Sequence, residues 1–170
     1  MDKTQFKNNS LHFEYTTDGY YDILRDPDAL FSIHLVKKSF AEEIHKEFTD
    51  QLYEDYLEDP AAFALQSSNQ TLGYLEIAQE RWHNRLRVTE LLILPGYRGR
   101  GYGSMLMDHA KEIGRVENVR ELVLETQSCN IKAIDFYVKQ GFIVNGIDLS
   151  AYSSEDVEKK EVRLEMVCRL

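Results

Sequence analysis

The stretch Leu91-Leu92-Ile93-Leu94, followed by Arg98-Gly99-Arg100-Gly101-Tyr102-Gly103, decides how this 170-residue chain can fold. The apolar run predicts a buried strand, and the residues from Ser104 to Ile113 have the spacing of an amphipathic helix. Glycines at alternate positions let the backbone approach an anion and turn several N–H groups toward it. The helix dipole and two arginines add positive charge. The stretch therefore predicts a pyrophosphate-binding loop between a strand and a helix.

The spacing of the glycines separates this loop from two other phosphate-binding loops. A dinucleotide-binding G-x-G-x-x-G is expected near the start of a βαβ unit, whereas this G-x-G-x-G lies beyond the middle of the chain. A Walker loop needs a Gly-Lys pair, and the chain has none. A glycine-rich turn with solvated arginines stays open as the alternative.

A second motif lies on the helix predicted from Asn130 to Gln140. Asn130, Ala133 and Tyr137 have the spacing i, i+3, i+7, which places an amide, a small side chain and a phenol on one face. Such a face could hold a pantetheine arm and place a hydroxyl beside its sulfur. The alternative is that the tyrosine only packs in the core. Gly141 is expected to end this helix in the left-handed conformation.

The two motifs together resemble the GCN5-related N-acetyltransferase (GNAT) superfamily. Arg98-x-x-Gly101-x-Gly103 is similar to its Arg/Gln-x-x-Gly-x-Gly/Ala signature, and the resemblance covers about a third of the chain, from Thr89 to Val144. Within the superfamily the pattern is similar to streptothricin acetyltransferases. That similarity rests on these positions: Leu124-Glu125-Thr126-Gln127, Asn130, Ala133, Phe136-Tyr137, Gly141-Phe142, Gly146-x-Asp148 and Tyr152.

The resemblance implies an α/β fold, with a central mixed sheet, helices on both faces and a splayed strand pair. It implies acetyl-CoA as co-substrate and no metal. The residues expected to bind acetyl-CoA are Leu92, Ile93, Leu94, Arg98, Gly99, Arg100, Gly101, Tyr102, Gly103, Ser104, Asn130, Ala133, Phe136 and Tyr137. In the resembled family a tyrosine at the position of Tyr137 is the usual general acid, and a strand amide, here that of Leu92 or Ile93, stabilises the oxyanion.

Glu90 is the candidate for recognising or deprotonating the amine. It is a lone acid in the apolar strand from Val88 to Leu94, and it corresponds to an acidic position that is common in the family's small-molecule members. An edge carboxylate paired with Arg87 or Arg98 is the competing interpretation. Asp148 and Tyr152 could bind a cationic amine through charge and ring face. A turn aspartate and a packed tyrosine explain them equally well.

Composition bounds the cellular setting. The chain suits one domain over residues 13–170 after a mobile end over residues 1–12. It has no apolar run long enough for a bilayer, its first residues lack the apolar core of a signal peptide, and two cysteines make no disulfide framework. A cytoplasmic enzyme without a membrane partner is expected. The net charge of −9 argues against nucleic acid and fits a cationic substrate. The family's frequent homodimers leave the oligomeric state open.

The remaining elements follow from hydrophobic periodicity. Apolar residues at every fourth position predict one or two amphipathic helices from Phe40 to Leu57. The expected strands are Leu30–Lys37, Ala62–Gln66, Leu72–Glu80, Leu86–Leu94, Glu121–Thr126, Phe142–Ile147 and Val162–Cys168, with Ala62–Gln66 and Leu72–Glu80 forming a hairpin around Asn69.

The expected reaction moves the acetyl group of acetyl-CoA to the amine of a small cationic substrate, with streptothricin as the candidate. The amine attacks directly and a tetrahedral intermediate forms. An alkyl ammonium with a pKa of about 10.4 is neutral in about one molecule in two thousand at pH 7, so the site must remove a proton. Two alternatives stay open: a protein or peptide N-acetyltransferase, and a non-catalytic acyl-CoA-binding sensor.

Overall fold

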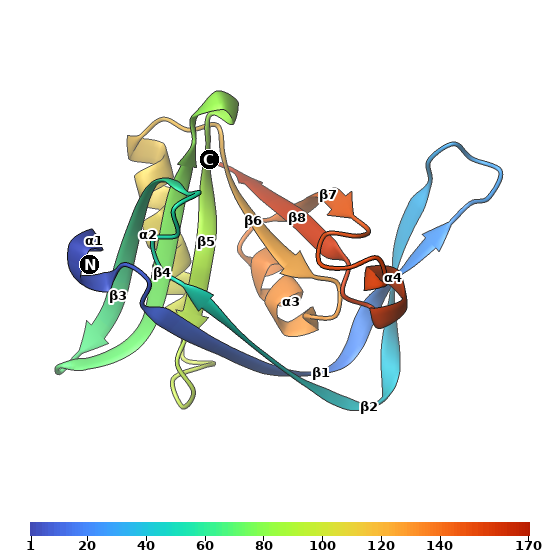
Figure 1. Ribbon diagram of the computed structural model, residues 1–170, viewed down its shortest axis with the longest axis horizontal. Coiled ribbons are helices and arrows are strands. Elements are labelled where there is room, and N and C mark those ends of the chain that lie inside the picture. The colour runs from blue at the N-terminus through green and yellow to red at the C-terminus, as the bar shows by residue number, and fades with distance from the viewer. The chain divides into compact units, whose positions relative to one another are not determined.

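The computed structural model describes residues 1–170, which form two compact units (Figure 1). The first unit comprises Met1–Phe13, Phe48–Leu124 and Val167–Leu170, and the second comprises Glu14–Glu47 and Glu125–Met166. The elements are α1 (Lys3–Phe6), β1 (Ser10–Arg25), β2 (Ile33–Gln51), β3 (Glu58–Ser67), β4 (Gln70–Glu80), η1 (Arg81–His83), β5 (Arg85–Ile93), α2 (Tyr102–Val116), β6 (Glu121–Gln127), α3 (Ile131–Lys139), β7 (Ile143–Asp148), α4 (Asp156–Lys159) and β8 (Arg163–Arg169).

The larger sheet is mixed, as the sequence predicts. Its hydrogen-bonded strand order is β3-β4-β5-β6-β8-β7. The strand β4 pairs antiparallel with β3 and β5, while β5 pairs parallel with β6 over Arg85–Arg87 and Glu121–Val123. Directly paired Arg85 and Glu121 form a buried ion pair of 2.7 Å, which fixes the start of the parallel pair. The mixed α/β fold class is therefore confirmed.

The helix α2 packs against β4 and β5. Its buried residues are Leu106, Met107, Ala110 and Gly114, which lie along one face, as the amphipathic spacing predicts. A Cβ on Gly114 would lie 2.4 Å from the side chain of Leu170 and 2.9 Å from that of Leu122. This glycine thus allows α2 to lie close to the sheet, and α2 in turn fixes the loop that precedes it.

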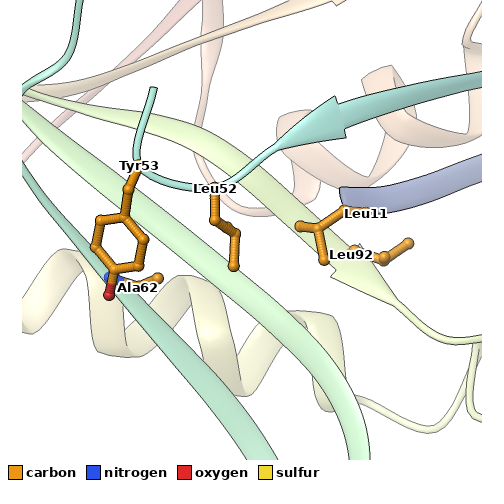
Figure 2. Close-up of a cluster of buried hydrophobic side chains, with 5 residues drawn as sticks. All are labelled: Leu11, Leu52, Tyr53, Ala62 and Leu92. Carbon is orange, nitrogen blue, oxygen red and sulfur yellow. The ribbon is translucent and has the colours of Figure 1, made fainter. Parts of the chain in front are cut away.

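A buried apolar cluster joins the ends of the long strands to the larger sheet within the first unit. Figure 2 shows its members, which are Leu11, Leu52, Tyr53, Ala62 and Leu92. The hydroxyl of Tyr53 accepts the N–H of Ala62 at 3.2 Å. Burial of Leu92 in this cluster orients β5, because alternate residues of a strand point to opposite faces.

In the second unit, α3 occupies the predicted segment and ends as expected. Gly141 has a φ of 90°, the left-handed conformation that glycine adopts without strain. Phe142 follows with 1% exposure, and the strands β7 and β8 come next, close to their predicted bounds.

The helix predicted from Phe40 to Leu57 is wrong, because most of that segment belongs to the strand β2. A spacing of four residues is also a multiple of two, so the same apolar residues share one face of a strand. Aromatic rings on β1 supply partners that no local pattern shows: Phe13 stacks on Phe48 at 4.8 Å, and Tyr20 contacts Phe40 at 4.6 Å. These cross-strand pairs stabilise the two-stranded sheet β1-β2.

The first residues have defined contacts. They include the helix α1. The amino group of Met1 donates to the carbonyl of Ala62 at 2.7 Å, and the carbonyl of Met1 accepts a hydrogen bond from the hydroxyl of Tyr53 at 2.7 Å. The mobility expected for residues 1–12 and a single domain over residues 13–170 stay predictions. No helix of the chain is long and apolar enough to span a membrane.

Candidate functional site

The glycine loop between β5 and α2 needs glycine because of its backbone conformation. Gly96, Gly99 and Gly101 have φ values of 85°, 75° and 85°, which other residues rarely adopt. A Cβ at any of the three would meet nothing within 4 Å. The glycines are thus required by the turn itself, and the space beside them could take a ligand.

Two arginines line this loop and both are exposed. The Nε of Arg98 donates to the carbonyl of Ile93 at 3.0 Å, which ties the side chain back to the end of β5. The guanidinium of Arg100 lies 5.9 Å from the ring of Tyr97. Gly101 is the N-cap of the 15-residue helix α2, whose first N–H groups have no partner within the helix. The loop therefore presents positive charge and backbone donors together.

The N–H groups of successive β5 residues point alternately toward β4 and away from it. This direction differs among the residues expected to contact acetyl-CoA. The N–H of Leu94 donates to the carbonyl of Leu72 at 3.0 Å, continuing the β4–β5 register. Residues two apart point their N–H groups to the same side, so the N–H of Leu92 also points toward β4. The N–H of Ile93 points to the opposite side, where Arg98 binds the Ile93 carbonyl.

Glu90 lies in the middle of β5 and is 8% exposed. The pKa of its carboxyl is raised to about 9, first by burial and then by the nearby acidic groups Asp50, Glu76 and Glu54. Its cross-strand partner in the β4–β5 register is Glu76. Arg87 forms an ion pair with Glu80 at 2.5 Å. Glu90 is thus a buried acid among acids, unlike the edge carboxylate of the competing interpretation.

Glu76 is fully buried and its two oxygens have different partners. Oε1 accepts the N–H of Tyr53 at 2.7 Å, and Oε2 accepts the hydroxyl of Thr89 at 2.8 Å. Burial raises the pKa of Glu76, and these two hydrogen bonds oppose the rise. The sequence analysis missed Glu76, although it too is a lone acid in an apolar strand. Asp50 was missed because the wrong helix prediction covered it.

The second unit holds the residues of the second motif on and around α3. The Oδ1 of Asn130 accepts the N–H of Ala133 at 3.3 Å, so its side chain caps the helix. Tyr137 is half-buried, with its ring 5.5 Å from that of Phe136 and 6.0 Å from that of Phe142. Capping and ring packing are thus local roles for Asn130 and Tyr137 beside any role toward a ligand.

Asp148 and Tyr152 join a polar cluster on β6, β7 and β8. Arg163 lies 3.4 Å from Asp148 and 3.5 Å from Glu125, and the hydroxyl of Tyr152 donates to Glu125 at 3.4 Å. Burial raises the pKa of Tyr152, and the nearby charge of Glu125 adds to that rise. The structure therefore brings the two expected substrate-binding residues into one cluster and adds an arginine that partly neutralises the carboxylates of Asp148 and Glu125.

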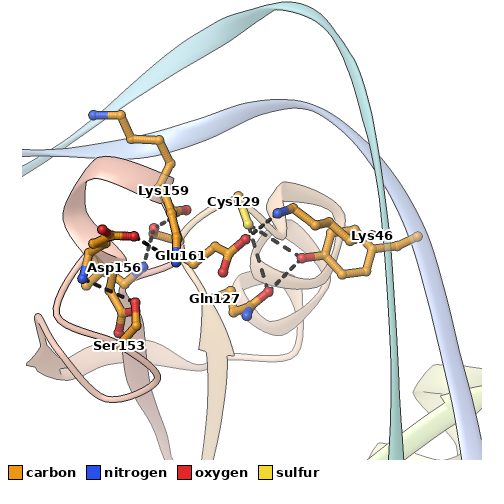
Figure 3. A network of polar contacts seen from close by, with 12 residues as sticks. Lys46, Gln127, Cys129, Ser153, Asp156, Lys159 and Glu161 are labelled. Carbon is orange, nitrogen blue, oxygen red and sulfur yellow. Dashed lines mark hydrogen bonds and ion pairs between the residues drawn. The ribbon is translucent and has the colours of Figure 1, made fainter.

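The sequence analysis also missed a polar network at the end of β6, where α3 begins. Figure 3 shows Gln127 and Cys129 close to one another; the hydroxyl of Tyr15 donates to Gln127 at 2.9 Å and lies 3.5 Å from the sulfur of Cys129. Burial raises the pKa of the Cys129 thiol, so it is not an activated nucleophile. The Oγ of Ser128 donates to the carbonyl of Lys160 at 2.8 Å. These contacts fix the end of β6 where α3 begins.

Each unit therefore carries part of the expected site. The first holds Glu90, the end of β5 and the glycine loop from Arg98 to Ser104; the second holds the α3 residues with Asp148 and Tyr152. No group of three or more His, Cys, Asp or Glu side chains in residues 1–170 could hold a metal ion. The ligand-binding roles of all these residues stay predictions.

Comparison with known proteins places the chain among acetyltransferases. It is 32% identical to the streptothricin acetyltransferase of Streptomyces lavendulae over 89 residues, 52% of this chain and 47% of the relative. It is also 32% identical to streptothricin acetyltransferase A of Bacillus subtilis (strain 168) over 97 residues, 57% of this chain and 56% of the relative. The matches thus span about half the length of these curated relatives.

Solved structures share the fold. The crystal structure of nourseothricin acetyltransferase superposes with a TM-score of 0.76 at 24% identity, covering 98% of this chain and 92% of that one. A Bacillus anthracis str. Ames protein assigned as a streptothricin acetyltransferase, solved with acetyl coenzyme A, gives a TM-score of 0.71 at 19% identity, covering 99% and 94%. Residues 20–142 match the acetyltransferase (GNAT) family, which is more than half of the chain. The chain therefore belongs to the acetyltransferase (GNAT) family.

Proposed function

We propose that this protein is an acetyl-CoA-dependent N-acetyltransferase that acts on the amine of a small cationic substrate, with streptothricin as the candidate acceptor. The observation that carries the proposal is the loop from Arg98 to Gly103, where left-handed glycines, two arginines and the N-terminus of α2 meet. The streptothricin acetyltransferases among its relatives supply the acceptor.

The residues of the loop fit the pyrophosphate of acetyl-CoA. The open space beside Gly99 and Gly101 would admit phosphate oxygens against backbone N–H groups, and the α2 dipole favours negative charge there. Arg98 and Arg100 would add charge-assisted hydrogen bonds. Acetyl-CoA supplies an activated acetyl group on a thioester, and the neighbouring strand β5 supplies backbone donors along the pantetheine.

The oxyanion donor we favour is the N–H of Ile93. It points away from β4, whereas the N–H of Leu92 points into the β4 pairing. A donor of this kind typically contributes about 10²–10³-fold to the rate. The phenol of Tyr137 would protonate the departing thiolate, the role that a tyrosine has in the resembled family.

Glu90 would accept the proton of the substrate ammonium. Its buried position and raised pKa make it a stronger base than an ordinary glutamate once it is ionised. The acidic groups around it would favour a cationic amine over a neutral one. Asp148, Tyr152 and Glu125 would form a second cation-binding cluster. A cytoplasmic location and a homodimer stay predictions.

The test is the release of coenzyme A, followed by thiol titration, with a panel of streptothricin, polyamines, aminoglycosides and short peptides. We expect rapid turnover of streptothricin, and Tyr137→Phe should lower this turnover about tenfold or more with little change in acetyl-CoA affinity. Turnover of another amine alone would overturn the acceptor but keep the reaction. Tight acetyl-CoA binding with no turnover in the panel would favour the sensor alternative.

A further inference from the structure

The strand β2 is the outer strand of the two-stranded sheet, and it pairs with β1 and with no other strand (Figure 1). The strand β1 lies on the inner side of this sheet, because the N–H of Tyr21 donates to the carbonyl of Ser128, between β6 and α3, at 2.8 Å. Residues 33–46 of β2 form no backbone hydrogen bond with any element except β1. One edge of β2 therefore presents a row of backbone donors and acceptors with which a further strand could pair.

The middle of β2 is exposed, unlike the strand beside it. Every residue in the range 36–43 is exposed except Phe40, which is half-buried. On β1, by contrast, Thr17 and Gly19 are buried. Natural proteins usually keep an uncovered edge strand short, whereas β2 has 19 residues. The length and the exposure of β2 thus favour a partner strand from outside the chain.

The sequence of this exposed stretch, from Val36 to Ile44, complements itself when two copies run antiparallel. In the register that places Phe40 opposite Phe40 of the partner subunit, each charged residue of the stretch faces one of opposite sign. The facing pairs are Lys37 with the partner's Glu43, Lys38 with the partner's Glu42, and the two pairs related to these by the twofold axis. A slip of two residues in either direction pairs no lysine of the stretch with a glutamate. Charge thus selects both a second copy as the partner and the register.

Apolar residues extend this match. Alternate residues of a strand share a face, so Val36, Phe40 and Ile44 lie on one side of β2. The same register places Val36 opposite the partner's Ile44 and the two Phe40 rings opposite each other. The ring of Phe40 already lies 4.6 Å from that of Tyr20 on β1, so aromatic contacts would continue across the new strand pair.

The charged side chains of the stretch are able to take these partners. Neither Glu42 nor Glu43 forms an ion pair within residues 1–170. Each lysine contacts one aspartate of its own chain, Lys38 at 2.6 Å and Lys37 at 3.4 Å, and about half of each lysine side chain stays exposed. A lysine ammonium has three donors, so each can also bind a second carboxylate.

We propose that the β2 strands of two copies pair antiparallel about a twofold axis at Phe40, which joins two β1-β2 sheets into one four-stranded sheet. The interface is isologous, because each copy contributes the same stretch. The net charge of −9 makes two copies repel each other at a distance, so the pairing depends on the local contacts between lysine and glutamate. This inference goes beyond the proposed acetyl transfer and does not rest on it.

Sedimentation velocity of the full chain, without acetyl-CoA or acceptor, tests the dimer and its charges. We expect a mass twice the 19.8 kDa of one chain. Lys37→Glu combined with Lys38→Glu should weaken dimerisation about a hundredfold or more, because four attractive pairs become repulsive. Glu42→Lys combined with Glu43→Lys should have the same effect. An equimolar mixture of these two variants should dimerise again, because all four pairs then have opposite signs.

The matched control is Lys3→Glu combined with Lys139→Glu, which makes the same change in net charge at exposed positions outside β2. It should leave the dimer intact. A monomer throughout the micromolar range would overturn the proposal and leave the edge of β2 to a strand of another protein. Undiminished dimerisation of the charge-reversed variants, or a mixture of the two that stays monomeric, would also overturn it.

Disulfide cross-linking tests the register. The variants Val36→Cys and Ile44→Cys, mixed and oxidised with copper phenanthroline, should give a covalent dimer on non-reducing electrophoresis. Either variant alone should give none, because its two introduced thiols lie far apart along the paired strands. The native Cys129 and Cys168 are buried. A mixture that cross-links no better than the single variants would show that the register is wrong.

The two assays separate this inference from the proposed function. A monomer that acetylates streptothricin would overturn the strand pairing and leave the function intact, whereas an inactive protein with the expected dimer and cross-link would do the reverse. Circular dichroism shows whether each variant is folded. If a charge-reversed variant does not fold, the cysteine variants, which keep every charge of the stretch, still decide the pairing.

Discussion

The middle of β5 and the loop that follows its end have opposite electrostatics, although only a few residues separate them. Glu90 in the middle is buried among acids, whereas Arg98 and Arg100 in the loop are exposed beside backbone donors. A buried acid that has lost its proton attracts cations, and an exposed cationic loop favours phosphates. One strand could thus serve two ligands of opposite charge, with the acyl-transfer position between them.

The comparison also predicts that the two regions respond to different substitutions. On the proposed function, the acidic region acts through side-chain carboxyls, which a single isosteric replacement removes. On the same proposal, the loop acts largely through its backbone conformation, which a change at a left-handed glycine would disturb. A substitution in one region should therefore leave the property of the other region intact.

The largest effect is expected for Glu90→Gln. Loss of the proposed base should lower kcat/KM for the acceptor about 10²–10⁴-fold, measured by coenzyme A release at pH 8. The affinity for acetyl-CoA should stay close to that of the unchanged protein, since the glycine loop is untouched. Stability at pH 7 should also change little, because a carboxyl with a pKa of about 9 is protonated at pH 7 and glutamine has nearly the same shape. An unchanged kcat/KM would leave Glu90 without a role in the reaction.

Glu76→Ala should have the reverse effect, a loss of stability larger than its loss of activity. It leaves the buried N–H of Tyr53 without its acceptor, at a cost of about 1–3 kcal/mol in the free energy of unfolding. Urea unfolding measures this loss. Thr89→Val removes only the second hydrogen bond and should cost about 0.5–1.5 kcal/mol. If Glu76→Ala kept full stability but lost activity as Glu90→Gln does, the distinction between these two facing acids would be wrong.

The fold from β3 onward could be predicted from sequence because its signals are local. Asn69 has positive φ in the turn where it was expected, and Gly101 and Gly141 mark the beginning of α2 and the end of α3. The segment from residue 40 to 57 could not be predicted, because its apolar spacing fits a helix and a strand equally. The strand is favoured over the helix by aromatic rings of β1 that contact this segment, and such tertiary contacts cannot be seen in the local sequence.

The candidate site divides in the same way. Glu90 and the glycine loop could be found because a lone acid in an apolar strand and alternate glycines stand out locally. Asp50 could not, since its charge acts on Glu90 only because the end of β2 lies near β5. The same holds for Arg163, which lies within 3.5 Å of both Glu125 and Asp148 only after β6, β7 and β8 have assembled. Both residues owe their place near the candidate site to contacts between segments that are distant in the sequence, which no local pattern shows.

The smallest effect is expected from changing the backbone of the loop, and the chain offers a close control. Gly96 and Gly101 share a φ of 85° and open space at Cβ, so a valine at either position carries a similar conformational cost, about 1–2 kcal/mol. Only Gly101 lies in the Arg-x-x-Gly-x-Gly pattern and caps α2. Gly101→Val should therefore weaken acetyl-CoA binding about tenfold beyond Gly96→Val, as measured by isothermal titration calorimetry, because the branched side chain would stand against the phosphates. Equal affinities in the two variants would mean that the glycines form the turn but do not contact the phosphates. The arginines would then be the groups of the loop that remain as candidates for phosphate binding.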